Sequence, residues 1–372
     1  MEQNNYQTET YFARQALEGK DVYRSRKGHS GSKKIPAERA LYLSVLRIVP
    51  PNPVCVVQIV HGIDERKERY LPFMQYLASR GMAVVIHDLR GHGASLLPEG
   101  LAYYGEDALD WLHTDIDTVY ASVYRPVPSS GKMEIGYADF PAVDPLPRYL
   151  LGFSMGALAA GSYAGANDDR LAGLMLAGMP HRERFVSFAL AWVSFLSLLG
   201  GETWRPPLLG RFSFRRYNTI FRRQGEVGEF LWLSENRENI EAFRADPLCG
   251  AVNTISAYRF LLTLVRDMYR PASWDMRRRD LPLWLLSGES DPIAGGDRWV
   301  LDSEDFLRDM GYTKLENRIF PRCRHEIFLD NNRYAVWQET AECILSVNNA
   351  ETARITAAME ADAAEYKSMF EK

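Results

Sequence analysis

The chain has 372 residues and a formal net charge of −4, and 46% of its residues are hydrophobic and 25% charged. These proportions are typical of a soluble globular protein, and the weakly acidic balance argues against nucleic acid as a partner. The length allows one large domain with an insertion, or two domains. The cysteines are widely spaced and form no C-x-x-C pair, which argues against a zinc site and a disulfide framework: Cys55, Cys249, Cys323 and Cys343.

The first third of the chain alternates apolar runs with helical patterns. Residues 1–38 are polar and lack the apolar core of a signal peptide, which predicts a cytoplasmic protein. Strand-like residues at 41–49 precede the nearly continuous apolar run 54–60, which is typical of a central parallel strand. Apolar side chains recur at helical spacing over 68–80 and end at Gly81, and another buried strand follows.

The middle and last thirds of the chain repeat this alternation. A helical stretch at 106–124 precedes the segment 125–148, whose Pro, Gly and Ser content predicts a loop. A further helical pattern lies at 302–310, and more apolar runs predict buried strands at 149–151, 170–178, 281–288 and 315–323. Strands that alternate with helices imply β-α-β units with right-handed crossovers. The sequence therefore predicts an α/β fold, with a mostly parallel central sheet and helices on both faces.

Residues 183–275 interrupt the alternation, because they contain helical stretches rich in aromatic residues and arginine but no convincing central strand. We predict a helical lid insertion over the carboxyl edge of the sheet, where α/β proteins place their sites. Its most apolar stretch, 185–201, is shorter than the roughly 20 residues that cross a bilayer, so a buried or membrane-touching helix is expected. The predicted division is a core in two parts, an insertion and a helical tail: 1–182 and 276–348, 183–275, and 349–372.

A G-x-S-x-G pentapeptide, residues 152–156, lies where an apolar strand ends and a helix rich in alanine and glycine begins. A strand that turns into a helix within one residue holds that residue at strained backbone angles, with its side chain pointing outward. Bulky residues two positions away would collide, which explains Gly152 and Gly156. The N-terminus of the helix also favours developing negative charge. Ser154 is therefore a candidate nucleophile.

A serine hydroxyl needs a base to accept its proton, and the base needs an acid to orient it. Of the seven histidines, His325 alone follows the predicted insertion, just beyond the last predicted strand. That position fits the chain order of serine, then aspartate or glutamate, then histidine. The acid should follow the preceding strand, where Glu289 and Asp291 are both candidates. We favour Asp291, because Asp-Pro after a short polar turn directs a carboxylate across the strand ends.

Five motifs, in the order HGIDE, HDLRGHGAS, GFSMG, SGESDP and RHEIF, resemble the α/β-hydrolase family. The resemblance is strongest to its monoglyceride lipase and lysophospholipase-like branch, of serine aminopeptidase type, and it covers roughly residues 41–347. It implies an α/β-hydrolase fold with Ser154 as nucleophile, His325 as general base and acid, and Asp291 as the orienting carboxylate.

The same resemblance implies an oxyanion hole formed by two backbone amides, those of Ile63 and Met155. Losing one such donor typically costs about 10²–10³ in rate. The resemblance implies no metal and no organic cofactor. The sequence departs from the branch at Phe153, where histidine is common, and in the length of segment 125–148.

Aromatic residues recur at three- and four-residue spacing in the insertion, at Phe185, Phe188, Trp192 and Phe195. Together with Phe153 they predict the wall of an acyl pocket; the alternative is a helix that packs on its own domain. We therefore predict a serine hydrolase that cleaves carboxylic esters of a small lipid-like substrate, monoacylglycerol or lysophospholipid. Arginine clusters at 214–223 and 277–279 are either solvated faces or contacts with anionic head groups. A transient contact of the lid with a membrane surface, peripheral to a cytoplasmic protein, is a further prediction.

Three alternatives stay open at this stage. The first is another acyl-transfer enzyme on the same scaffold, such as a thioesterase, an amidase or aminopeptidase, or an acyltransferase. The second is a non-catalytic binding protein that keeps the fold. The third is a scaffold role through the terminal helix. The sequence makes no prediction of an oligomeric state.

Overall fold

The computed structural model describes residues 6–16, 41–105, 107–136, 139, 146–206, 209, 215–294 and 297–349. Apart from its first residue, the predicted helical tail 349–372 lies outside the described residues. The polar stretch 17–40 within the N-terminal segment also lies outside them.

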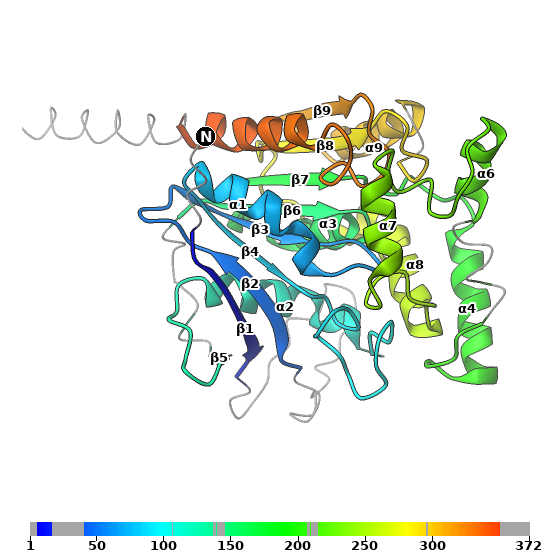
Figure 1. Ribbon diagram of the computed structural model, residues 1–372, viewed down its shortest axis with the longest axis horizontal. Coiled ribbons are helices and arrows are strands. Elements are labelled where there is room, and N and C mark those ends of the chain that lie inside the picture. The colour runs from blue at the N-terminus through cyan, green and yellow to red at the C-terminus, as the bar shows by residue number, and fades with distance from the viewer. Residues whose placement is uncertain are drawn as a thin grey trace, which may run out of the picture.

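Within the described residues, nine strands form one sheet in the order β5-β1-β2-β4-β3-β6-β7-β8-β9 (Figure 1). Strand β2 is antiparallel to both of its neighbours, β1 and β4, and the other neighbouring strands are parallel to each other. This mostly parallel sheet confirms the predicted fold class. The strands are β1 (Thr8–Gln15), β2 (Leu43–Ile48), β3 (Cys55–Val60), β4 (Met82–His87), β5 (Lys132–Ile135), β6 (Arg148–Phe153), β7 (Gly173–Ala177), β8 (Leu283–Gly288) and β9 (Leu315–Phe320).

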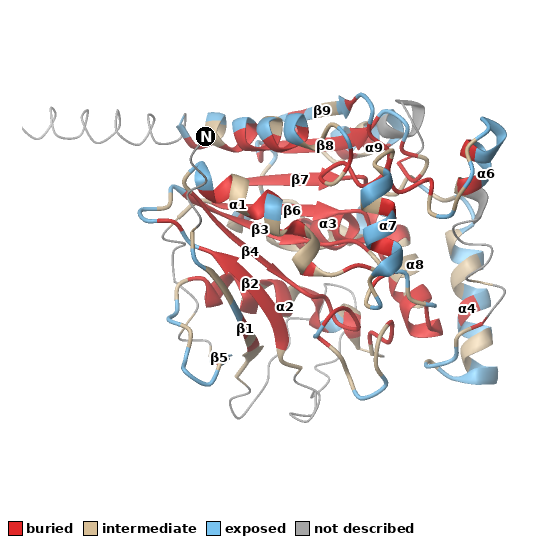
Figure 2. Ribbon diagram, in the orientation of Figure 1, coloured by how far each residue is buried: buried red, intermediate tan, exposed pale blue. Residues whose placement is uncertain are grey.

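The central strands are buried along their whole length because helices cover both faces of the sheet. Every residue of β3, β4, β6 and β8 is buried, as is usual for parallel strands between two helical layers (Figure 2). On one face, α1 and the helical residues 333–349 pack on the sheet through a cluster that includes Phe73 and Trp337. On the other face, α2, α3, α8 and α9 share a second cluster.

The helices begin and end as follows: α1 (Leu71–Ser79), α2 (Ala108–Ser122), α3 (Met155–Asn167), α4 (Val186–Gly200), α6 (Arg215–Arg223), α7 (Arg237–Ala245), α8 (Ile255–Met268) and α9 (Asp297–Asp309). Short 3-10 turns lie at η2 (Lys67–Tyr70), η4 (Asp168–Arg170) and η5 (Pro271–Ser273). None of the described helices combines the length and the apolar character that a bilayer span requires.

Helices α4, α6, α7 and α8 lie between β7 and β8 in the chain. Figure 1 shows α4, α6 and α7 on the side toward which the arrows of β7 and β9 point, which is the carboxyl edge of the sheet. Helix α4 packs on α8 through Val193, Ile255 and Tyr258. The residues at which this insertion begins and ends, 183 and 275, stay a prediction.

Two strands at one side of the sheet, β1 and β5, were not expected from the sequence. Strand β1 lies in the polar N-terminal segment, and of its own eight residues only Tyr11 and Ala13 are deeply buried. Strand β5 lies in the predicted loop 125–148 and pairs with β1 in parallel. Strand β5 forms the edge of the sheet and β1 lies beside it. Neither strand is buried along its whole length, because the core covers this margin of the sheet incompletely. Part of the unusual length of segment 125–148 therefore extends the sheet.

Candidate active site

Ser154 lies at the one-residue turn between β6 and α3, and its backbone has φ 55° and ψ −119°. A positive φ is strained for a residue with a side chain, so packing must hold it there. A Cβ at Gly152 would come within 2.2 Å of the carbonyl oxygen of Gly156, and a Cβ at Gly156 within 2.0 Å of that of Val60. The two glycines therefore allow backbone to meet backbone, which is the steric requirement that the sequence indicated.

The structure brings the three predicted triad side chains together. His325 Nε2 lies 2.8 Å from Ser154 Oγ, and His325 Nδ1 lies 2.9 Å from Asp291 Oδ2. The other carboxylate oxygen of Asp291 accepts hydrogen bonds from the amides of Ile293 and Ala294, at 2.8 and 3.2 Å. Glu289, the alternative acid, is exposed to solvent. The arrangement allows a proton to pass from the hydroxyl to an imidazole whose other nitrogen faces a carboxylate.

Two aromatic rings pack against the His325 imidazole. Phe153 lies 4.9 Å away between ring centroids, and Trp232 lies 5.4 Å away. On a further side, a Cβ at Gly178 would come within 3.1 Å of His325 Cε1, and Gly178 has φ +53°. These contacts restrict rotation of the imidazole and shield it from water. Sequence reasoning missed Trp232, because a tryptophan in a helical insertion gives no signal of what it packs on.

The predicted oxyanion donors, Ile63 and Met155, belong to two backbone segments that pack on each other next to this turn. Met155 is the first residue of α3, where an amide has no acceptor within the helix. Ile63 follows His61 and Gly62 after β3, and the close approach of Gly156 to the Val60 carbonyl packs the two segments together. Among the described residues, neither amide has a hydrogen-bond acceptor. Both are therefore free to donate to a ligand.

His61 shapes the loop that carries Ile63. Its Nε2 accepts a hydrogen bond from the Leu89 amide at 3.0 Å, and its Nδ1 lies 2.7 Å from the Gly62 carbonyl oxygen. Burial lowers the pKa of His61 to about 3, so the imidazole is neutral and suited to this bridging role. Asp88 and Arg90, from the next loop, pair with Lys67 and Asp115. The first pair ties this loop to η2, and the second ties it to α2.

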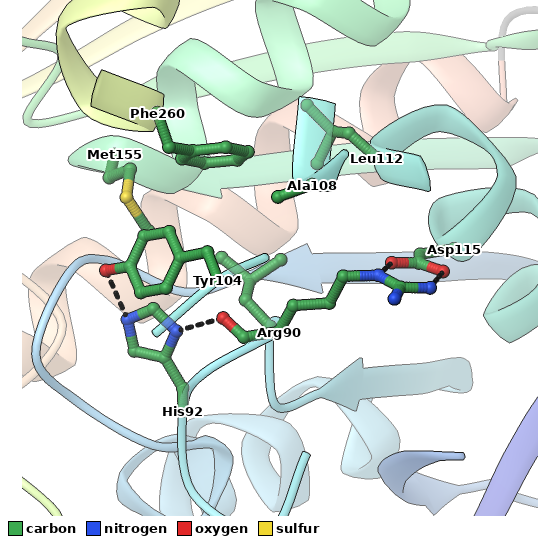
Figure 3. A pocket seen from close by; sticks show the side chains of 9 residues that line it. Arg90, His92, Tyr104, Ala108, Leu112, Asp115, Met155 and Phe260 are labelled. Atoms are coloured by element: carbon green, nitrogen blue, oxygen red, sulfur yellow. Dashed lines mark hydrogen bonds and ion pairs between the residues drawn. The ribbon is translucent and has the colours of Figure 1, made fainter. Parts of the chain in front are cut away.

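A small pocket adjoins the turn on the Met155 side (Figure 3). Its volume is about 10 Å³, close to the least that holds one water molecule. His92 forms part of the lining, and its ring nitrogens lie 3.1 Å from the Tyr104 hydroxyl and 3.1 Å from the Arg90 carbonyl oxygen. The remaining lining is largely apolar: Leu89, Ala108, Leu112, Met155 and Phe260. The residues that were predicted to form an acyl pocket are not part of it.

Those predicted pocket residues divide into two groups. Phe153 is buried beneath His325. Phe185 and Phe188 are 76% and 73% exposed, and Trp192 and Phe195 are 48% and 47% exposed. The structure therefore presents the four aromatic side chains of the α4 segment largely to solvent and does not enclose them around Ser154. Their role in substrate binding stays a prediction.

Solved structures of hydrolases share this architecture. An open-form lipase has 22% identity over 83% of this chain and 96% of its own, with a TM-score of 0.68. A soluble variant of monoglyceride lipase from Saccharomyces cerevisiae has 16% identity over 82% and 93% of the two chains, with a TM-score of 0.60. A monoacylglycerol lipase from Paleococcus ferrophilus has 17% identity over 82% and 99%, with a TM-score of 0.57. At these identities the likeness shows the fold, which is that of the α/β hydrolases.

A search of curated proteins by sequence finds no match. The Hydrolase_4 family, described as serine aminopeptidase S33, matches residues 51–332. The matched region contains the turn at Ser154, the predicted insertion and the loop that carries His325. Because it covers more than half of the 372 residues, the chain belongs to the serine aminopeptidase S33 family of α/β hydrolases, as its motifs predicted.

Proposed function

We propose that this protein is a serine carboxylic-ester hydrolase that acts on a lipid-like monoester, such as a monoacylglycerol or a lysophospholipid. The observation that carries the proposal is the buried chain of hydrogen bonds from Ser154 through His325 to Asp291. A non-catalytic binding protein would have no need to hold a serine at a strained φ of 55° with an imidazole 2.8 Å from its hydroxyl.

In the proposed reaction, Ser154 Oγ attacks the ester carbonyl carbon while His325 Nε2 accepts the hydroxyl proton. The amides of Ile63 and Met155 donate hydrogen bonds to the oxygen that gains negative charge. His325 then gives its proton to the leaving alcohol, and an acyl-enzyme remains. Water deprotonated by His325 attacks that acyl group, and collapse of the second intermediate returns the serine hydroxyl and releases the fatty acid. Asp291 stabilises the imidazolium in both halves.

Two observations favour a lipid-like ester over the other acyl substrates. The α4 segment carries large apolar side chains within the insertion that borders the site, and they suit an acyl chain. Phe153, Phe185, Phe188, Trp192 and Phe195 are the residues that we propose contact it. Proteins with this fold include a lipase and two monoacylglycerol hydrolases. The family description names an aminopeptidase, so amide hydrolysis is the main alternative.

We further propose that α4 contacts a membrane surface transiently, so that the protein is cytoplasmic but peripheral to its substrate's bilayer. The fifteen residues of α4 contain no charged side chain, and only Val193 among them is buried. Exposed arginines, Arg182 and Arg184, precede the helix. An apolar face beside basic side chains fits lipid tails beneath anionic head groups.

An ester panel graded by acyl length and head group tests the proposed substrate class. We expect the highest kcat/KM for monoacyl esters of glycerol or glycerophosphate, and no turnover of any ester by Ser154→Ala. Matched amides and thioesters of the same acyl groups identify the alternative enzymes, and an added alcohol acceptor reveals acyl transfer. Undiminished hydrolysis by Ser154→Ala, with a folded protein, would remove the proposal.

A further inference from the structure

A buried network of ions links two loops of the site without touching the triad. Arg69, in the turn η2, donates to Glu65 Oε2 at 2.9 Å and to both carboxylate oxygens of Glu326, at 2.6 and 2.8 Å. Glu65 and Glu326 are 2% and 3% exposed, and the Arg69 side chain is 10% exposed. Asn239 of α7 completes the network, since it bonds both Arg69 and Glu326.

One end of the network holds the loop that follows β3, residues 61–63, which we call the oxyanion loop because it carries the Ile63 amide. Glu65 Oε1 accepts a hydrogen bond from the Gly62 amide at 2.6 Å and another from the Tyr70 hydroxyl at 3.0 Å. A Cβ at Gly62 would come within 2.8 Å of that same carboxylate oxygen, so glycine allows the carboxylate to approach the backbone. The next residue is Ile63. The direction of its amide therefore depends on where the Glu65 carboxylate is held.

The other end of the network holds the loop that follows β9 and carries His325. Glu326 follows His325 directly, and its amide donates to the Leu233 carbonyl oxygen at 2.7 Å. The bidentate bond to Arg69 fixes the Glu326 side chain. A residue adjacent to the imidazole is thus anchored on both its backbone and its side chain.

The network also places a buried, paired charge on the residue that follows His325 in the chain. Two carboxylates share one guanidinium, and the pKa of Arg69 is raised because Glu326 and Glu65 outweigh the effect of burial. Burial raises the pKa of Glu65 to about 7, although Arg69 acts to lower it. The other titratable groups that face Arg69 and His325 are Tyr70, His61, Cys249 and Asp291. Without Arg69, the buried carboxylate of Glu326, the residue that follows His325, would lose the guanidinium that compensates its charge.

We propose that Arg69 is a positioning residue: through Glu65 and Glu326 it holds the oxyanion amide of Ile63 and the imidazole of His325 in fixed relation, and it neutralises the carboxylate of the residue that follows His325. This inference rests on the proposed function of the triad. It assigns to a single side chain the alignment of a transition-state donor with the general base, which lie 262 positions apart in the chain.

Arg69→Met tests the proposal by steady-state kinetics on a soluble ester from pH 5 to 9. We expect kcat to fall about 10–100-fold with KM within about threefold, because alignment matters most in the transition state. We also expect the acid limb of kcat/KM to move up by about half a pH unit, since the uncompensated Glu326 carboxylate favours the imidazolium. Arg69→Lys keeps the charge and should restore the acid limb but only part of kcat.

Arg66→Met is the matched control, because Arg66 lies in the same segment and pairs with Asp246 instead. It should leave both kcat and the acid limb unchanged. Glu326→Gln provides a second test if Arg69→Met fails to fold; it should lower kcat about tenfold and move the acid limb to lower pH, since it removes the anion.

The inference is overturned if folded Arg69→Met, or Glu326→Gln in its place, keeps the wild-type kcat and acid limb. An equal loss in Arg66→Met would also overturn it, because the effect would then be general to the segment. Ser154→Ala separates this result from the proposed function. If that variant is inactive while Arg69→Met behaves as wild type, only the positioning role fails.

Discussion

His87 ends β4 as a fully buried imidazole, and among the described residues neither of its ring nitrogens has a hydrogen-bond partner. Burial, with smaller contributions from Arg90 and Lys67, lowers the pKa of His87 to about 3. In the unfolded chain its pKa returns to about 6.5. Between these two values the unfolded state binds a proton that the native state does not, so His87 lowers the free energy of unfolding as the pH falls.

We therefore expect His87→Leu to be progressively more stable than the wild type as the pH drops. The free energy of unfolding of the variant, minus that of the wild type, should increase by roughly 2 kcal/mol from pH 7.5 to pH 5, because at pH 5 the unfolded imidazole is charged. Urea unfolding of both proteins at the two pH values measures it. A constant difference would show that His87 takes up a proton in the native state.

Single residues of the site differed in how far the sequence predicted them. Ser154, Asp291 and His325 follow from motif chemistry and chain order, and the structure brings their side chains into one hydrogen-bonded chain. Trp232 and Arg69 could not be predicted, since their significance arises from contacts with residues far away in the sequence. The sequence does place Glu65 four residues before Arg69, but that spacing predicts only a local ion pair between the two.

At the scale of elements, α4 differs from the other described helices in its exposed apolar surface. Leu198 is 83% exposed, and Leu199 is 67% exposed at the same end of the helix. The aromatic spacing predicted a helix there, and the structure forms it. The sequence could not show which side would face the protein, because nearly the whole helix is apolar and its burial depends on contacts that only the folded chain makes, such as that of Val193 with α8.

Leu198→Asp tests the proposed membrane contact of α4. We expect the wild type to sediment with phosphatidylglycerol vesicles and the variant to bind at least about tenfold more weakly, since burying one leucine contributes about 1.5–3 kcal/mol. Val227→Asp is the control, because Val227 is 85% exposed elsewhere in the insertion. Equal binding of Leu198→Asp and the wild type would contradict the contact.

Strands were predictable to the extent that they were buried. The apolar runs of β3, β4, β7 and β8 identify central strands without further information. The edge strand β5 and its neighbour β1 carry no such run, and their pairing joins segments more than a hundred residues apart. Pairing at that separation depends on the finished sheet, which a local pattern does not contain.

At the scale of the whole molecule, the insertion is bonded to both loops of the site. Asn253 donates to Asp64 at 2.8 Å beside the oxyanion loop, and the Leu233 carbonyl accepts from the amide of Glu326 beside the imidazole. The Asp330 carboxylate, five residues after His325, accepts hydrogen bonds from the amides of Glu235 and Asn236 in the insertion. These hydrogen bonds show that the insertion helps to hold the loops of the site in place. The sequence predicted only that it would lie over the site as a lid.

The central claim is that Ser154 is a nucleophile activated by His325. Labelling with a fluorophosphonate, followed by peptide mass spectrometry, tests it most directly. We predict one stoichiometric adduct on Ser154 in the wild type, and none in Ser154→Ala or in folded His325→Gln. An unlabelled wild type, or an adduct that forms as fast in His325→Gln, would contradict the account.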